Sequence, residues 1–321
     1  MAGPPTLDHL RQAAERIKPY IHRTPVLTCR AINAMVGAEL FFKCENFQKA
    51  GAFKFRGATN AVFSLTEQEA RRGVGTHSSG NHAGALALAA RTRRVKAYVV
   101  MPQNAPQVKK DAVAGYGAEI TFCTPTLEAR EQTLAKVVEA TGAAVVHPYN
   151  DYRVIAGQAT AALELMEDVA DLDIIMTPIG GGGLACGTAL SVRYVQPKTK
   201  VIAAEPMGAD DAYRSFSAGE LIPSENPKTI ADGLLTSLGD KTFPIVSEFL
   251  DDIVTVSEQG IVEAMRCIWE RMKIVVEPSA VVPLGALLTG QLDVTNRRVG
   301  IILSGGNVDL GRLPWLDGQE S

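Results

Sequence analysis

Short apolar segments alternate along this chain with longer segments whose apolar residues recur at helical spacing. Segments 7–17, 107–116 and 127–141 have the helical pattern, and Thr6, Pro19 and Gly142 mark helix ends. Strands are predicted at 38–46, 96–102, 118–125, 173–179, 200–206 and 299–304. This alternation predicts an α/β fold, with largely parallel sheets flanked by helices. We expect residues 73–150 to form a small mobile domain inserted between two parts of a larger one, 1–72 and 151–321.

Composition narrows the function classes. Hydrophobic residues make up 46% of the 321 residues, charged residues 21%, and the net charge is -3. These values are typical of an ordinary globular protein, and they favour neither nucleic acid nor a membrane as partner. The five cysteines are scattered, without metal-ligand spacing, which predicts reduced thiols in a cytoplasmic protein.

Three predicted strands end in polar turns that contain glycine: "HSSGNH" at 77–82, "GGGG" at 180–183 and "SGGN" at 304–307. In an open parallel sheet, ligands bind beyond the carboxyl ends of the strands. Glycines there let backbone amides approach an anion closely. The three turns therefore predict an anionic ligand at this edge.

A lysine among apolar residues indicates which anionic ligand the protein binds. Lys54 lies in "AGAFKFRGA", and such a lysine can be retained because its amine reacts. Together with a tetraglycine turn, it suggests pyridoxal phosphate, whose aldehyde binds an amine. A rival interpretation is a nicotinamide- or flavin-linked oxidoreductase, because Gly180, Gly182, Ala185 and Glu205 satisfy the spacing of a dinucleotide site.

The motifs "AFKFRGA", "THSSGNH", "IAGQ", "GGGG", "AAEP", "ADD", "IADG", "EPS" and "LSGGNVDL" occur in one order along the chain. In this order they resemble serine racemase and the serine/threonine dehydratases, which are fold type II pyridoxal phosphate enzymes. The resemblance covers residues 7–315. It implies that the larger domain binds the cofactor, that the protein is a homodimer, and that a small amino acid is its substrate.

The resemblance also implies roles for the residues of the cofactor site. Lys54 would bind the cofactor as a Schiff base, Asn81 would contact the ring hydroxyl and Ser304 the pyridine nitrogen. Phe53 would pack on the ring, or simply be part of the core. The phosphate would be held by the amides of Gly180, Gly181, Gly182 and Gly183. A hydroxyl at the pyridine nitrogen makes the ring a weaker electron sink than an aspartate would, which favours β-elimination.

The substrate residues follow from the same resemblance. The implied set is Ser78, Ser79, Gly80, His82, Arg130, Tyr149 and Ser237. Lys54 would remove the α-proton, and Ser79, on the other side of the α-carbon, leaves racemisation open. His82 alone is equally compatible with a helix terminus, and Arg130 with a solvated helix face.

A divalent-cation site is implied at "AAEPMGADD". Its ligands would be the carboxylates of Glu205 and Asp211 and the carbonyl of Ala209, a set suited to Mg²⁺, Ca²⁺ or Mn²⁺. Spacing alone favours a capped helix start, and it is the match to the family that favours a cation.

Serine and threonine come first as expected substrates, and 3-hydroxyaspartate is the alternative. Arg130 and Arg153 would both favour a dicarboxylic substrate. The expected activity is dehydration and deamination of a β-hydroxy amino acid to a 2-oxo acid and ammonia. A predominant serine or aspartate racemase, a dedicated 3-hydroxyaspartate dehydratase and an amino-acid sensor without turnover remain alternatives.

Overall fold

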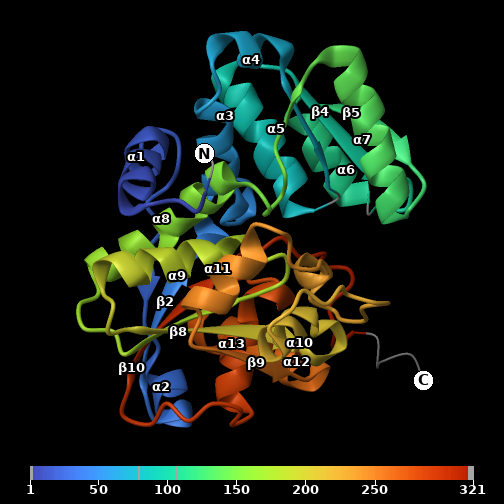
Figure 1. Ribbon diagram of the computed structural model, residues 1–321. Coiled ribbons are helices and arrows are strands. Elements are labelled where there is room, and N and C mark those ends of the chain that lie inside the picture. Colours follow the sequence, from blue (N-terminus) through green and yellow to red (C-terminus); the bar gives the residue numbers. More distant parts are fainter. Residues whose placement is uncertain (1–2, 79, 106, 317–321) are drawn as a thin grey trace.

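Two sheets form the framework of the protein, and they lie one above the other in Figure 1. The computed structural model describes residues 3–78, 80–105 and 107–316. The larger sheet has the strand order β1-β2-β10-β7-β8-β9, and the smaller has the order β5-β4-β3-β6. Only the β1–β2 pair is antiparallel. The strands are β1 Val26–Leu27, β2 Glu39–Cys44, β3 Val74–His77, β4 Ala97–Pro102, β5 Glu119–Cys123, β6 Ala144–Val145, β7 Ile174–Pro178, β8 Lys200–Pro206, β9 Asp252–Val256 and β10 Arg298–Leu303.

Helices cover both faces of the larger sheet, as expected for buried parallel strands. On one face α9 packs against β7 and β8, and α8 lies against α9; on the other face α13 crosses the sheet with α12 outside it. The helices are α1 Leu7–Ile17, α2 Arg30–Val36, α3 Lys54–Phe63, α4 Glu67–Arg72, α5 Asn81–Arg93, α6 Gln107–Gly115, α7 Leu127–Thr141, α8 Tyr152–Asp168, α9 Gly183–Val195, α10 Asp211–Ala218, α11 Thr242–Phe249, α12 Glu258–Met272 and α13 Pro278–Leu288. Short 3₁₀ turns are η1 Glu45–Phe47, η2 Lys49–Gly51, η3 Met207–Ala209 and η4 Asp232–Leu234.

Local sequence signals explain several helix ends. Helix α1 begins directly after Thr6. The Thr126 hydroxyl caps α7, and Gly142 ends this helix in the left-handed conformation that glycine adopts without strain. The two largely parallel sheets and their flanking helices confirm the α/β architecture predicted from the sequence.

The four strands of the smaller sheet lie between residues 74 and 145, within the segment predicted to be a separate domain. Helix α3 precedes this segment, yet Phe55 and Ala58 pack with Leu86 of α5 in one hydrophobic cluster. The mobility of the smaller domain stays a prediction. In the described part of the chain, no helix is both long and apolar enough to cross a bilayer.

The order of the strands places the predicted site. Strand β10 lies between β2 and β7, and β8 follows β7. All four are parallel, so the segments after Cys44, Leu303, Pro178 and Pro206 leave the sheet at one edge.

Candidate active site

Lys54 is the first residue of α3, and backbone contacts attach its segment to the end of β10. Ala52 forms an isolated β-bridge with Gly305, and the Phe53 amide donates to the Ser304 carbonyl at 2.9 Å. The Lys54 Nζ donates to the Pro148 carbonyl at 3.0 Å and lies 5.1 Å from the centre of the Phe53 ring. Two predicted cofactor residues, Lys54 and Ser304, are thus adjacent.

The environment of Lys54 favours a neutral amine. Burial lowers the pKa of Lys54 to about 8, and the more distant carboxyl of Glu277 opposes this change only in part. A larger fraction of this amine is therefore unprotonated near neutral pH than of an exposed lysine. An unprotonated amine is the form that reacts with an aldehyde.

The tetraglycine turn follows β7 and opens α9. Gly182 has a φ of 86°, and all four glycines are buried. Among the described residues, none of the four amides donates to a backbone acceptor. Buried amides almost always have a partner, and a helix start favours an anion. The turn therefore fits a phosphate.

Tyr149 packs on the tetraglycine turn. A Cβ at Gly181 would lie 2.4 Å from the Tyr149 ring, and one at Gly183 would lie 3.0 Å from the Tyr149 Cβ. The ring also contacts His147 edge-on at 4.6 Å between centroids. Burial raises the pKa of Tyr149 to about 12, so its hydroxyl is protonated at neutral pH. The residue before Tyr149 accepts the hydrogen bond of Lys54, so this segment contacts both the amine and the anion cradle.

Asn81 begins α5 and is bonded to two residues across the site. Its Nδ2 donates to Glu277 at 2.8 Å, and its Oδ1 accepts from Asn307 at 3.0 Å. Glu277 is buried, and burial raises its pKa to about 7. A cavity of about 620 Å³ borders Asn81 and Asn307. The side chain of Asn81 therefore lies between the two sheets, next to a cavity.

The loop after β3 and the first turn of α5 carry four predicted substrate residues. Ser79 is outside the described residues. Ser78 and Gly80 are half-buried, and a Cβ at Gly80 would meet no atom within 4 Å. His82 is buried, with Nε2 3.2 Å from the Val146 carbonyl and Nδ1 without a partner among the described residues. Burial lowers the pKa of His82 to about 3, so it provides no positive charge for a carboxylate.

The residues predicted to bind a cation surround the start of α10. Both oxygens of Glu205 accept backbone hydrogen bonds, from Ala212 at 3.0 Å and Tyr213 at 2.8 Å, so this carboxylate caps the helix. Asp211 is buried, and neither carboxylate oxygen has a hydrogen-bond partner among the described residues. Burial raises the pKa of Glu205 to about 9 and of Asp211 to about 6.

An unpartnered buried carboxylate fits a cation. Within the ranges that the structure describes there is no cluster of three His, Cys, Asp or Glu side chains able to hold a metal. A cation at Asp211 would therefore also need backbone oxygens, such as the carbonyl of the buried Ala209, and water.

Arg130 and Arg153, the two arginines predicted to favour a dicarboxylic substrate, differ in their hydrogen-bond partners. Arg130 is half-buried in the first turn of α7 and lies close enough to His77 to lower its pKa, although burial is the larger cause. Arg153 instead donates to Asp151 and to the Val145 carbonyl, at 2.6 and 3.0 Å from Nη2. Its charge is thus already paired, and the expectation of two available arginines was wrong for Arg153. Ser237 accepts a hydrogen bond from the Ser224 amide at 2.7 Å.

Comparison with known proteins identifies the family. Residues 17–305 match the family model described as "Pyridoxal-phosphate dependent enzyme". A β-hydroxyaspartate dehydratase of Paracoccus denitrificans is 54% identical, covering 97% of this chain and 99% of its own.

Two solved structures are similar over most of their length. The serine racemase of Dictyostelium discoideum is 53% identical with a TM-score of 0.92, covering 95% of this chain and 99% of that one. The maize serine racemase is 47% identical with a TM-score of 0.94, covering 99% of this chain and 97% of that one. The chain belongs to the pyridoxal-phosphate dependent enzymes and has their type II fold, as the resemblance implied.

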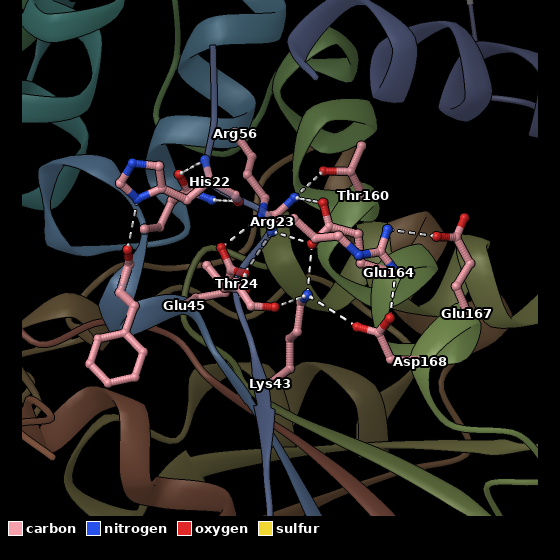
Figure 2. Close-up of polar contacts among 12 residues, drawn as sticks. His22, Arg23, Thr24, Lys43, Glu45, Arg56, Thr160, Glu164, Glu167 and Asp168 are labelled. Carbon is pink, nitrogen blue, oxygen red and sulfur yellow. Dashed lines mark hydrogen bonds and ion pairs between the residues drawn. The ribbon is translucent and has the colours of Figure 1, made fainter. Parts of the chain in front are cut away.

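Two features of the site had no assigned role at the level of sequence. Glu277 lies in the motif "EPS", which contributed only to the resemblance. The buried charges around Arg56, two residues after Lys54, were also overlooked (Figure 2). A signal was available in the alternation of charged and apolar residues at 43–45 and 54–56, because charges inside apolar segments need partners when buried.

Proposed function

We propose that this protein eliminates water from small L-β-hydroxy amino acids, with 3-hydroxyaspartate as principal substrate and serine and threonine as further ones. Water leaves from the β-carbon, the resulting enamine is released and hydrolysed by water, and the products are a 2-oxo acid and ammonia. The observation that carries the proposal is the half-buried Lys54, whose pKa burial lowers to about 8. It lies beside Ser304 and the segment that packs on the tetraglycine turn, whose amides have no backbone acceptor among the described residues.

Each residue of the site has a role that follows from its position. Bound pyridoxal phosphate supplies an electron sink at the substrate α-carbon. Lys54 would bind this cofactor, and its free amine would take the substrate α-proton as general base. Gly180, Gly181, Gly182 and Gly183 hold the phosphate with their amides, and Ser304 and Asn81 fix the ring. Ser78 and Gly80 lie where the loop after β3 can receive the substrate carboxylate.

The choice of 3-hydroxyaspartate rests on Arg130. Because Arg153 is paired with Asp151, Arg130 is the remaining arginine for a second carboxylate. The relative from Paracoccus denitrificans is named for its action on β-hydroxyaspartate. A charged hydrogen bond to a second carboxylate would lower the transition-state free energy for this substrate, relative to serine, by about 1.5–3 kcal/mol.

The substrate assignment is tested by steady-state kinetics with Arg130→Ala. We expect kcat/KM for 3-hydroxyaspartate to fall by about 10- to 100-fold, corresponding to that free energy, while the value for serine stays within about threefold. Arg71→Ala is the matched control, because Arg71 is an exposed arginine of α4, the helix at the top of Figure 1. Equal losses on both substrates, or none on 3-hydroxyaspartate, would reject the role of Arg130.

A second activity, racemisation of the substrate α-carbon, is favoured by the similarity to serine racemase. Ser79 would exchange a proton on the side of the α-carbon opposite to Lys54. Assaying the D-amino acid and the 2-oxo acid in one reaction measures both activities. Absence of D-serine from L-serine at full conversion would exclude it.

Three further properties belong to the proposal. The carboxylates of Asp211 and Glu205 and the carbonyl of Ala209 hold a divalent cation, Mg²⁺, Ca²⁺ or Mn²⁺, with a structural or activating role. The protein acts in the cytoplasm, which agrees with its five free cysteines. It works as a homodimer, an assembly suggested by the resemblance, and sedimentation velocity measures this directly.

A further inference from the structure

A cluster of buried charged side chains surrounds the start of α3 (Figure 2). Lys43 comes from β2, Glu45 begins η1, Arg56 is in the first turn of α3 and Glu164 is in α8. The side chains of Lys43, Glu45 and Arg56 are 0% exposed, and that of Glu164 is 14% exposed. The cluster therefore joins four elements and contains two positive and two negative groups.

Arg56 uses all of its hydrogen-bond donors in this cluster. Nε and Nη2 donate to Glu45 at 2.7 and 2.8 Å, and Nη1 and Nη2 donate to Glu164 at 2.8 and 2.7 Å. Nη1 also donates to the Thr160 hydroxyl at 3.1 Å. A guanidinium has five N–H groups, and these five contacts fix its plane and its rotation.

Lys43 and the neighbouring Thr24 hold the two carboxylates in place. Lys43 Nζ donates to Glu164 and to the Thr24 carbonyl, both at 2.7 Å. The Thr24 hydroxyl donates to Glu45 at 2.5 Å. Each carboxylate that holds Arg56 is thus itself held by a second donor.

Lys54 and Arg56 are two residues apart in the same helical turn. Residues at this spacing lie about 200° apart around a helix, so their side chains leave it on nearly opposite sides. Lys54 reaches Pro148 on the side of the active site, whereas Arg56 enters the charged cluster. The turn that carries the reactive amine is therefore attached on one side to Ser304, through Phe53, and on the other to η1 and α8, through Arg56.

Stability alone does not account for this cluster. Taking charges out of water costs several kcal/mol per ion, and well-packed apolar residues can often replace a buried ion pair without loss of stability. Directional bonds from a planar group, in contrast, define the position of a helix turn closely. An error of about 1 Å in the placement of a reacting group can lower a rate about 100-fold.

We propose that Arg56, held by Glu45 and Glu164, is a positioning residue that sets the location of the Lys54 amine. This inference rests on the proposed function, in which Lys54 binds the cofactor. It assigns to the charged cluster a task in cofactor capture and catalysis in addition to any structural one.

The test compares Arg56→Lys and Glu164→Gln with the unchanged protein. Lysine keeps the charge but lacks the planar fork, and glutamine keeps the shape but lacks the charge. Apo-protein is mixed with pyridoxal phosphate, quenched with borohydride at set times, and the modified Lys54 peptide is quantified by mass spectrometry. We expect Arg56→Lys to slow capture and to lower kcat by about 100-fold, with KM within about threefold. We expect Glu164→Gln also to slow cofactor capture and to lower kcat.

Arg23→Ala is the control, because Arg23 is 53% exposed and joins the outer end of the network through Glu167 and Asp168. It should capture cofactor at the unchanged rate. The inference is overturned if folded Arg56→Lys or Glu164→Gln captures cofactor at the native rate and only its Tm falls, or if Arg23→Ala loses as much as they do. Should Arg56→Lys fail to fold by circular dichroism, Glu164→Gln decides alone. Absence of any adduct at Lys54 in the unchanged protein would instead reject the proposed function.

Discussion

At the scale of single residues, the site depends on a lysine that is partly shielded from solvent and whose pKa lies close to neutral pH. Lys54 has one hydrogen bond, to the Pro148 carbonyl, and no carboxylate forms an ion pair with it among the described residues. Desolvation then favours the uncharged amine. The same side chain can bind an aldehyde and later accept a proton, because its pKa lies near the working pH.

The lowered pKa of Lys54 predicts the pH dependence of cofactor capture. Below pH 8 the protonated amine does not react, so the capture rate of the apo-protein should rise about tenfold per pH unit and level off above about pH 8. Stopped-flow absorbance of added pyridoxal phosphate measures this rate. Nα-acetyl-lysine is the control, and its rate should rise up to about pH 10.4. A rate for the protein that still rises tenfold between pH 9 and 10 would contradict the account.

Local patterns in the sequence predicted Lys54 and the four glycines as cofactor residues, whereas the role of Ser304 followed from the resemblance alone. These roles stay predictions. Glu277 was not assigned, since its contact with Asn81 joins residues far apart in the chain. Arg153 was assigned wrongly because its partner, Asp151, is also the cap of α8, and a sequence does not show which way the side chain turns. Long-range pairing thus limits prediction more than local chemistry does.

At the scale of elements, the turn from β7 to α9 is shaped by contacts that exclude side chains. A Cβ at Gly180 would lie 2.8 Å from the Leu234 backbone, and at Gly182 a positive φ adds backbone strain to close contacts. The absence of side chains leaves the amides at the start of α9 accessible to an anion. The packing of this turn therefore requires glycine, and phosphate binding by its amides is the role proposed for it.

Gly181→Ala should damage this turn through a collision with the Tyr149 ring. We expect overpacking to cost about 1–3 kcal/mol in free energy of unfolding, measured by urea denaturation, and cofactor affinity to fall as the turn moves. Gly115→Ala is the control, because a Cβ there meets nothing within 4 Å and alanine suits a helix better. If Gly181→Ala binds cofactor as tightly as the unchanged protein, the turn does not hold the phosphate.

The elements were predictable from local patterns, whereas the order of their strands followed only from the resemblance to a known family. The apolar runs gave β7, β8 and β10, and caps gave α1 and α7, since these signals are local. The insertion of β10, from the end of the chain, between β2 and β7 is not encoded in any local pattern. That insertion brings Ser304 beside Lys54, so the site depends on a feature that local patterns do not display.

At the scale of the whole molecule, the protein combines two sheets with a site assembled from both. Asn81 follows the smaller sheet, whereas Lys54, Ser304 and the tetraglycine turn follow strands of the larger one. Lys109 of α6 also forms an ion pair with Asp232 of η4 across the two parts. Stability of the larger sheet therefore bears directly on the site, and the start of α10 is where a cation would contribute to it.

Removal of divalent cations should destabilise the protein. Burial raises the pKa of Asp211 to about 6, above about 3.9 in an unfolded chain, so the folded state loses stability as pH rises from about 4 to 6. A cation offsets this loss, and at 100 times its Kd it stabilises by about 2.7 kcal/mol. Thermal unfolding with Mg²⁺, Ca²⁺ or chelator should thus show a larger cation effect at pH 8 than at pH 5.

Asp211→Asn provides the check on this site. We expect it to abolish the cation effect and to raise Tm in chelator, whereas Asp210→Asn, which breaks only an exposed pair with Arg214, should keep the cation effect. A cation effect that persists in Asp211→Asn would place the cation elsewhere.

The central claim is that the amine of Lys54 binds the cofactor covalently. The most direct measurement is peptide mass spectrometry of the holoenzyme after borohydride reduction. The account predicts one pyridoxyl group per chain, on the peptide that contains Lys54. A pyridoxyl group on any other residue, or none in protein that still turns over substrate, would contradict it.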